Sequence, residues 1–199
     1  ARVVPVVRAL RSEEPCARIS VDTSDPDVAR AAVAAGADLI NDVRGLRDPR
    51  LRDAFSELGV PAVGCPLGGE PATMQAAPRF DDVVAEVAAE LRAARARALD
   101  AGVPDVILDP GLGFGKTSAH NRAMLRATTA MTELGAPLLV GASRKRSLGE
   151  VADEPVPERR DAASVAAHLH AAARGAALVR AHDVPAHVQA LRIWRWLDG

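Results

Sequence analysis

The sequence of 199 residues is 48% hydrophobic and carries a formal net charge of −1, which fits one packed domain or part of a larger barrel. That charge, with 3% aromatic residues and no tyrosine, excludes a basic or base-stacking surface for nucleic acid and gives no electrostatic attraction to a membrane. No apolar run reaches the ~18 residues of a membrane-crossing helix, and Cys16 and Cys65 form no metal-type spacing. We therefore expect one cytoplasmic domain over residues 1–199, with reduced thiols.

The first element expected is a helix over residues 3–10. The chain opens inside this helix and does not begin with Met, so we expect that an N-terminal part is missing. Helical patterns, several of them Ala-rich, predict further helices over residues 27–35, 49–58, 81–100, 118–133, 159–174 and 185–197. The longest predicted loop covers residues 65–78, and another, rich in Pro and acidic residues, covers residues 151–157.

A helical pattern that ends in Gly and is followed by a short apolar strand recurs along the chain. Gly just past a helix end adopts the left-handed conformation at little cost, so these glycines mark helix ends. They are Gly36, Gly59, Gly102, Gly135 and Gly175. Together with an earlier strand at residues 19–21, the predicted strands cover residues 38–40, 61–63, 105–108, 138–140 and 177–179. Short apolar strands separated by helices indicate parallel βα units.

Polar residues follow nearly every predicted strand. In a (β/α) barrel the carboxyl ends of all strands open onto one face, and that face carries the site. In an open doubly wound sheet the same residues would lie at a topological switch point. Polar groups at so many strand ends favour the barrel. We therefore predict an α/β fold of the TIM (β/α)8 type, incomplete, with about six βα units.

The only two lysines, Lys116 and Lys145, both lie in glycine-containing loops that follow predicted strands, in a chain with 25 Lys and Arg residues. Where a site needs the compact ammonium of lysine, the guanidinium of arginine cannot take its place. We interpret Lys145 as functional, whereas Lys116 is equally compatible with a functional role and with chance survival on the surface.

Three strand-end residues have side chains suited to a heterocyclic ligand. Asp22 ends a strand and could accept paired N–H donors; its alternative role, a helix cap, is better filled by Asp25 or Asp27. Asn41 offers both a donor and an acceptor, but it also suits a turn. Asp109 follows a strand and precedes a glycine loop that resembles a phosphate cradle but lacks the Walker spacing.

Two later strand ends carry groups suited to an anion. Ser143-Arg144-Lys145 brings a hydroxyl and two cations to one strand end. Arg180 and His182 follow the last strand two residues apart, and together they form a plausible anion clamp. The remaining histidines and both tryptophans fall in helical stretches, and we interpret them as surface or packing residues: His120, His168, His170, His187, Trp194 and Trp196.

These motifs together resemble the dihydropteroate synthase family, the folate-pathway enzymes of the pterin-binding barrels. The matches run in family order over essentially the whole chain. They are Ile19-Ser20-Val21-Asp22-Thr23, Ile40-Asn41-Asp42-Val43, Pro71-Ala72-Thr73-Met74-Gln75, the segment from Leu108 to Lys116, Val140-Gly141-Ala142-Ser143-Arg144-Lys145, and Val179-Arg180-Ala181-His182-Asp183-Val184. The Asp-Pro-Gly-x-Gly-Phe and Ser-Arg-Lys motifs, in this order, are the specific pair.

The resemblance implies a transferase that condenses 6-hydroxymethyl-7,8-dihydropterin pyrophosphate with p-aminobenzoate. It implies that the pterin is held by Asp22, Asn41, Asp109 and Lys145, of which Asp109 and Lys145 are catalytic. It also implies that Arg180 and His182 bind the pyrophosphate. Ser143 would lie near the aminobenzoate, and Phe114 would form a wall of the site. It also implies a homodimer and a Mg²⁺ cofactor. The family's metal-binding Asn belongs to an opening strand motif that this sequence lacks, so we expect no metal ligand in this chain.

The sequence departs from the family pattern at three places. The opening strand motif and the second strand's Ser-Thr-Arg-Pro loop are absent. The segment from Cys65 to Pro71 lacks the family's His and basic residue, and Ser147 stands where a Phe is common. A catalytically weak pterin-binding paralogue, a corrinoid-linked methyltetrahydrofolate methyltransferase of the same barrel family and a non-enzymatic interaction module therefore stay as alternatives. The Ser-Arg-Lys motif disfavours the methyltransferase.

Overall fold

The computed structural model describes residues 2–65 and 80–198. The chain divides into two compact units, one of Ala1–Pro66 with Ala89–Leu108 and one of Leu67–Ala88 with Asp109–Gly199. Apart from Cys65, the predicted loop over residues 65–78 lies outside the described residues, and so does the family-like segment from Pro71 to Gln75.

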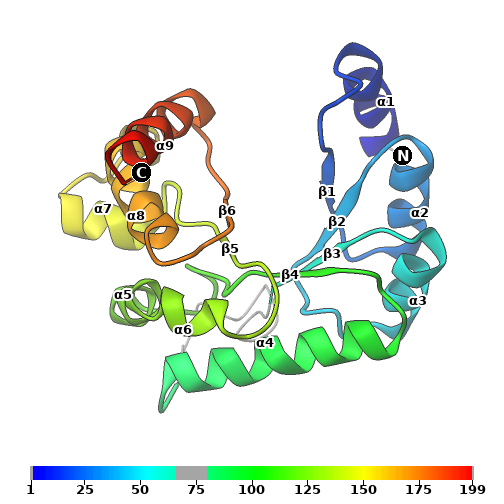
Figure 1. Cartoon of the computed structure of the whole chain (residues 1–199), viewed down its shortest axis with the longest axis horizontal. Coiled ribbons are helices and arrows are strands. Elements are labelled where there is room, and N and C mark those ends of the chain that lie inside the picture. Colours follow the sequence, from blue (N-terminus) through cyan, green and yellow to red (C-terminus); the bar gives the residue numbers. More distant parts are fainter. Residues whose placement is uncertain (1, 66–79, 199) are drawn as a thin grey trace. The chain divides into compact units, whose positions relative to one another are not determined.

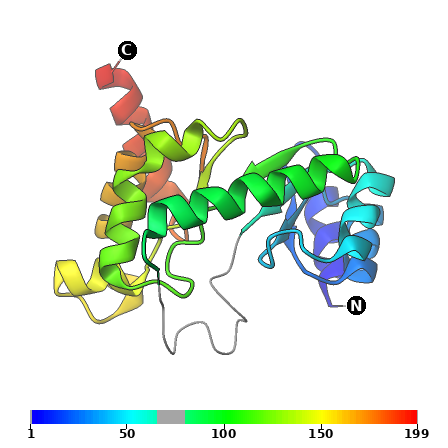
Figure 2. The ribbon, with the colours of Figure 1, turned by 90° about the horizontal axis from the view of Figure 1, so that it is seen from below.

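The first unit is a parallel sheet with helices between its strands (Figures 1 and 2). Its four strands are hydrogen-bonded in chain order and in parallel. Val21 pairs with Ile40, Ile40 with Ala62 and Ala62 with Val106. The elements are α1 (Val3–Glu13), β1 (Ser20–Asp22), α2 (Pro26–Ala34), β2 (Leu39–Asp42), α3 (Pro49–Leu58), β3 (Ala62–Gly64), the part of α4 (Val83–Asp100) that begins at Ala89, and β4 (Val106–Leu108).

Local sequence signals set the bounds of these helices. The Asp48 side chain accepts the Arg50 N–H at the start of α3, and Gly59 ends that helix with a φ of 63°. Asp25 caps α2 by accepting the N–H groups of Asp27 and Val28, which leaves Asp22 out of the capping role. All the predicted helix-end glycines have positive φ, between 63° and 112°, which confirms the pattern: Gly36, Gly59, Gly102, Gly135 and Gly175.

A buried carboxylate organises the turn after β2. Asp42 is 0% exposed, and its Oδ2 accepts the Leu46 N–H at 2.8 Å while its Oδ1 accepts the Ser24 hydroxyl and the Arg44 N–H. These bonds hold Leu46 at a φ of 57°, unusual for a residue with a branched side chain, and bury it completely. Asp42 is therefore a structural residue next to the predicted ligand Asn41.

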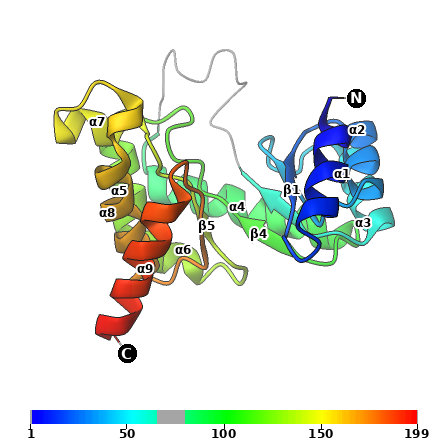
Figure 3. The same ribbon diagram turned by 90° about the horizontal axis from the view of Figure 1, so that it is seen from above.

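The second unit has two parallel strands and a set of helices (Figure 3). Leu139 pairs with Leu178 and Val140 with Val179. The elements that follow the first part of α4 are α5 (Ser118–Arg126), α6 (Thr128–Thr132), β5 (Leu139–Val140), α7 (Arg146–Ala152), the 3₁₀ helix η1 (Pro157–Arg159), α8 (Asp161–Ala172), β6 (Leu178–Val179) and α9 (Val184–Asp198).

All the predicted strands are confirmed, and their pairings are parallel. The predicted helix over residues 118–133 is wrong in being continuous, because the chain breaks at Ala127 between α5 and α6. The predicted loop over residues 151–157 is wrong at its start, because Val151 and Ala152 still belong to α7, a helix that the sequence did not reveal. Closure of the strands into a barrel stays a prediction.

Within the described ranges, none of the helices combines the length and the apolar character that crossing a membrane requires.

Candidate functional site

The predicted ligands of the first unit are paired with each other at adjacent strand ends. Asp22 is the last residue of β1, and Asn41 lies opposite it in β2. Asn41 Nδ2 donates to Asp22 Oδ2 at 2.8 Å. The Asn41 Oδ1 atom is buried and accepts no hydrogen bond from the described part of the chain. Because such an acceptor costs free energy until it is satisfied, it marks a place where a ligand N–H would be stabilised.

Asp109 follows β4 directly and begins the glycine loop of the second unit. Its Oδ1 accepts the Gly111 N–H at 2.8 Å. Burial raises the pKa of the Asp109 carboxyl above its usual range, although the Gly111 N–H and the charges of Lys145, Lys116 and Arg180 oppose that rise. The ionised carboxylate would be stabilised by a ligand with several N–H donors, since their hydrogen bonds replace the hydration that burial removes.

Lys116 holds the glycine loop together from the inside. It is 3% exposed, and its Nζ donates to the carbonyl oxygens of Gly111 at 3.0 Å and Phe114 at 3.3 Å. Asn121 of α5 supports the same loop, because its Oδ1 accepts the Gly113 N–H at 2.8 Å. These contacts give Lys116 a structural role, which the sequence left open.

Lys145 reaches across to the glycine loop and meets Phe114. Its Nζ lies 4.3 Å from the centroid of the Phe114 ring, a cation–π distance. A β-carbon added at Gly113 would be 2.8 Å from Lys145 Cδ, and Gly113 has a φ of 80°. The backbone conformation favours glycine, and an added β-carbon would also displace the Lys145 side chain. The Gly113 backbone and the Lys145 ammonium thus form one arrangement that joins the two loops.

Arg144, the middle residue of Ser-Arg-Lys, binds a helix of the protein. Its Nε and Nη2 donate to the two carboxylate oxygens of Asp161, each at 2.8 Å, and its backbone N–H donates to Ser164 Oγ at 2.9 Å. The paired hydrogen bonds from Arg144 lower the pKa of the Asp161 carboxyl. Arg144 has a φ of 59°, and Arg160 donates to its carbonyl at 3.1 Å. Its guanidinium is thus engaged in positioning the loop.

Ser143 and His182 are in direct contact. The His182 N–H donates to Ser143 Oγ at 3.2 Å, and His182 Nδ1 lies 2.9 Å from the same oxygen. Arg180 is near as well. A β-carbon added at Gly141 would lie 3.9 Å from Arg180 Cβ and 4.0 Å from Asp109 Oδ2, which are van der Waals distances. The structure therefore brings the ends of β5 and β6 together beside Asp109.

A cavity of about 560 Å³ lies against these groups. Three cationic side chains, Lys145, Arg180 and Arg144, contribute to its lining, together with the Ser143–His182 pair. The 3₁₀ helix η1 lines it too, with Pro157 and Glu158, residues that sequence reasoning did not single out. A cavity of this size with clustered cations and a hydroxyl suits a small anionic ligand.

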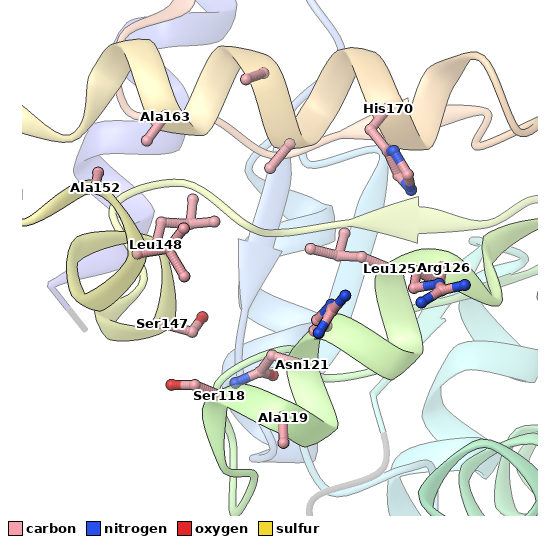
Figure 4. Close-up of a pocket in the computed structure, with 14 residues that line it drawn as sticks. Ser118, Ala119, Asn121, Leu125, Arg126, Ser147, Leu148, Ala152, Ala163 and His170 are labelled. Carbon is pink, nitrogen blue, oxygen red and sulfur yellow. The ribbon is translucent and has the colours of Figure 1, made fainter.

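A second cavity of about 790 Å³ lies between α5, α7 and α8, and Figure 4 shows Leu125, Leu148 and His170 facing it. None of the predicted site residues lines this cavity. It is far more apolar than the first, so the chemistry indicated by the sequence belongs to the smaller cavity.

Sequence reasoning missed two buried histidines. His168 and His187, interpreted as surface or packing residues, are 1% and 4% exposed and hydrogen-bonded to each other at 2.8 Å. The signal that could have identified His168 is its spacing from Asp161 and Ser164, which places all three on one face of a helix. His120 has a local role, because it completes a capping box with Thr117 at the start of α5.

The described residues do not supply a metal centre. In residues 2–65 and 80–198, there is no group of three or more His, Cys, Asp or Glu side chains that could hold a metal ion.

The whole arrangement has known relatives. The family model described as "Pterin binding enzyme" matches residues 1–182. The dihydropteroate synthase of Haemophilus influenzae is 40% identical over 196 residues, which is 98% of this chain and 70% of that protein.

Solved structures of the Thermus thermophilus dihydropteroate synthase are also similar. The complex with 4-aminobenzoate is 49% identical with a TM-score of 0.95, and the match covers 98% of this chain and 80% of that one. The complex with 6HMPPP is 49% identical with a TM-score of 0.95, covering 98% and 78%. These likenesses indicate an α/β fold of the TIM-barrel type.

Proposed function

This chain belongs to the family of pterin-binding enzymes, and on that premise we propose that it carries out the dihydropteroate synthase reaction. In that reaction 6-hydroxymethyl-7,8-dihydropterin pyrophosphate condenses with p-aminobenzoate, giving 7,8-dihydropteroate and pyrophosphate. The relatives named above support this assignment at 40% and 49% identity. The protein is thus a transferase of folate biosynthesis.

One observation carries the assignment to this chain's own residues. Lys145, Arg180 and the Ser143–His182 pair line a single cavity of about 560 Å³. Asp109 lies beside it, next to Gly141. A leaving pyrophosphate needs cations, and an electron-poor carbon needs a nearby carboxylate, so the residue types fit both halves of the reaction.

In the proposed mechanism, Arg180 and His182 bind the pyrophosphate and stabilise the negative charge that grows as the C–O bond breaks. The electron pair of that bond leaves with pyrophosphate, and the pterin methylene becomes electron-poor. Asp109 stabilises this positive charge. The amine nitrogen of p-aminobenzoate, oriented beside Ser143, then forms the new C–N bond and loses a proton to solvent. No protein nucleophile is needed.

From the resemblance we propose that Asp22, Asn41, Asp109 and Lys145 hold the pterin ring. In the first unit, Asp22 and the unsatisfied Asn41 Oδ1 offer acceptors for ring N–H groups. In the second unit, Asp109 accepts further N–H donors, and Lys145 donates to a ring acceptor from its place above Phe114. Phe114 forms an apolar wall for the ring.

Three further properties are proposed from the resemblance. Mg²⁺ would accompany the pyrophosphate, but the described residues do not form its site, so no step above passes through it. A homodimer is proposed, and light scattering of the purified protein tests it. A cytoplasmic location is also proposed, since Cys16 and Cys65 lack the dense paired spacing of secreted disulfide-bonded domains.

The deciding experiment is to purify the protein that carries this chain and supply it with the pterin pyrophosphate and p-aminobenzoate. We expect stoichiometric 7,8-dihydropteroate and pyrophosphate, measured by chromatography and a pyrophosphate assay. Asp109→Asn should remove product formation. Tight pterin binding with no product under any condition would support the inactive-paralogue alternative instead.

A further inference from the structure

A chain of hydrogen bonds through two buried histidines joins the ends of β5 and β6. The Ala142 N–H donates to His168 Nε2 at 2.9 Å. His168 Nδ1 lies 2.8 Å from His187 Nε2, and His187 Nδ1 lies 2.6 Å from the Asp183 carbonyl oxygen. Ala142 follows β5, His168 is in α8, and His187 is in α9. Four separate segments of the second unit are therefore connected in one line.

The direction of these bonds fixes the tautomer of both rings. A backbone N–H can only donate, so His168 Nε2 must be the unprotonated nitrogen and its proton must be on Nδ1. That Nδ1–H donates to His187 Nε2, which must then be unprotonated. The His187 proton is therefore on Nδ1, where it donates to the Asp183 carbonyl. A single assignment, neutral Nδ1–H on both rings, satisfies every bond.

Helix α8 presents a row of polar residues to the loop after β5. Asp161, Ser164 and His168 are spaced at i, i+3 and i+7, which places them on one face of the helix. Asp161 binds the Arg144 guanidinium, Ser164 Oγ accepts the Arg144 N–H, and His168 accepts the Ala142 N–H. The loop that carries Ser143 and Lys145 is thus fixed to α8 on both sides of Ser143.

The line of bonds also reaches the loop after β6. Asp183 directly follows His182, and Ser143 directly follows Ala142. The two proposed ligand residues, Ser143 and His182, contact each other, and their chain neighbours are joined through the two imidazoles. The separation between these loops is therefore fixed by two sets of contacts, the one between Ser143 and His182 and the one through the two imidazoles.

We propose that His168 and His187 are positioning residues for the pyrophosphate end of the site, which hold Ser143 and His182 in register without touching the ligand. This inference rests on the proposed function, because it assumes that His182 and Arg180 bind a phosphate group. The two rings act as a spacer of fixed length and fixed hydrogen-bond direction, which an apolar pair of similar size would not reproduce.

The surroundings of His168 keep its ring neutral. Burial, and secondly the electrostatic interaction with His187, lowers the pKa of His168 to about 4. A neutral ring is required, because protonating either histidine would set two N–H groups against each other or against Ala142.

The first test is the tautomeric state of the wild-type protein. In ¹⁵N spectra of the imidazole rings at about pH 7.5, His168 and His187 should both show a protonated Nδ1 and an unprotonated Nε2. Nε2–H tautomers, or averaged shifts typical of rapidly exchanging rings, would refute the spacer. This measurement needs no ligand and no mutant, so it decides the structural part even if variants fold poorly.

The second test compares substitutions at His168 with matched ones at His170, which lies on the same helix outside the line of bonds. The probe is inorganic pyrophosphate, with its dissociation constant measured by calorimetry alongside kcat and KM. His168→Ala should weaken pyrophosphate binding about tenfold, since one hydrogen-bonded contact is worth roughly that factor. His168→Gln should recover most of the loss, because its amide oxygen can accept the Ala142 N–H. His170→Ala and His170→Gln should match the wild type.

The outcomes separate this inference from the assignment of function. If His168→Ala lowers the melting temperature but binds pyrophosphate as the wild type does, the histidines are structural only and the inference is wrong. If the glutamine variant is as weak as the alanine variant, the hydrogen-bond argument is wrong. A wild type that binds pyrophosphate yet makes no dihydropteroate overturns the proposed function and leaves the comparison between variants intact.

Discussion

Lys145 lies directly on the backbone of Gly113, so that a β-carbon at Gly113 would come within 2.8 Å of Lys145 Cδ. The contact couples two loops that are distant in sequence, and it leaves the ammonium above the Phe114 ring. The position of the proposed pterin-binding charge therefore depends on a residue that has no side chain.

Gly113→Ala should displace Lys145 and weaken pterin binding while the protein stays folded. Gly59→Ala is the matched control, since Gly59 has a similar φ of 63° but open space around an added β-carbon. Both variants should lose about 1–2 kcal/mol of stability from backbone strain. Only Gly113→Ala should also weaken pterin affinity in calorimetry; equal affinities for the two variants would contradict the coupling.

Asp109→Asn should abolish pterin binding without destabilising the protein. The pKa of Asp109 is raised by burial, so the charged form is costly in the free protein and its removal costs little stability. The lost hydrogen bonds to ring N–H groups are worth about 1.5–3 kcal/mol each, or at least tenfold in affinity. Unchanged pterin affinity in calorimetry would show that Asp109 does not contact the ring.

Pterin binding should also release protons. A pKa raised in the free protein should fall when ring N–H donors stabilise the carboxylate, so binding moves Asp109 from its protonated toward its ionised form. Calorimetry in buffers of different ionisation enthalpy measures this directly. The released fraction should grow as the pH is lowered toward the raised pKa and should vanish in Asp109→Asn. Proton uptake in the wild type would contradict the argument.

Lys145 and Arg180 should serve different parts of the substrate. Lys145→Arg places a larger planar group where Gly113 and Phe114 leave room for a slim chain, so it should weaken binding of the free pterin. Arg180→Lys removes a forked phosphate contact, so it should weaken the pyrophosphate ester about tenfold or more and leave the free pterin almost unaffected. Equal losses of both ligands in both variants would argue against this division.

Stability should fall below about pH 6.5 because of His168. Its pKa is near 6.5 when unfolded and about 4 when folded, so between these values the unfolded chain binds a proton that the folded chain does not. Its contribution is complete above about pH 6.5 and decreases by about 1.4 kcal/mol per pH unit toward about pH 4. Urea unfolding at several pH values measures the slope. His168→Gln should lose this slope and His170→Gln should keep it.

The strands and their polar ends were predictable because the signals are local. Helix-ending glycines such as Gly59, apolar runs of three or four residues and an Asp directly after β4 can all be recognised without tertiary contacts. Helix α7 could not be predicted in this way, because Gly149 weakens its helical pattern. The reason for that glycine is tertiary: an added β-carbon would collide with the Arg160 guanidinium.

The roles of site residues were predictable where the side chain is proposed to bind a ligand, and less predictable where it binds another part of the protein. Ser143, Arg144 and Lys145 all line the cavity, but the Arg144 guanidinium is held by Asp161. Residue type alone could not distinguish them, since all three are polar and adjacent. One partner of His168 is the Ala142 backbone amide, and no residue type in the sequence marks such a bond.

The attachment of Arg144 to α8 affects how much a match to the Ser-Arg-Lys motif says about activity. Within one three-residue signature all three residues line the cavity, but the guanidinium of the middle residue is bound to Asp161 and maintains the scaffold. A descendant that lost its chemistry could keep the arginine for the sake of folding and would still score well in a motif search. Assigning activity to distant homologues should therefore weigh the residues on either side of the arginine more heavily than the arginine itself.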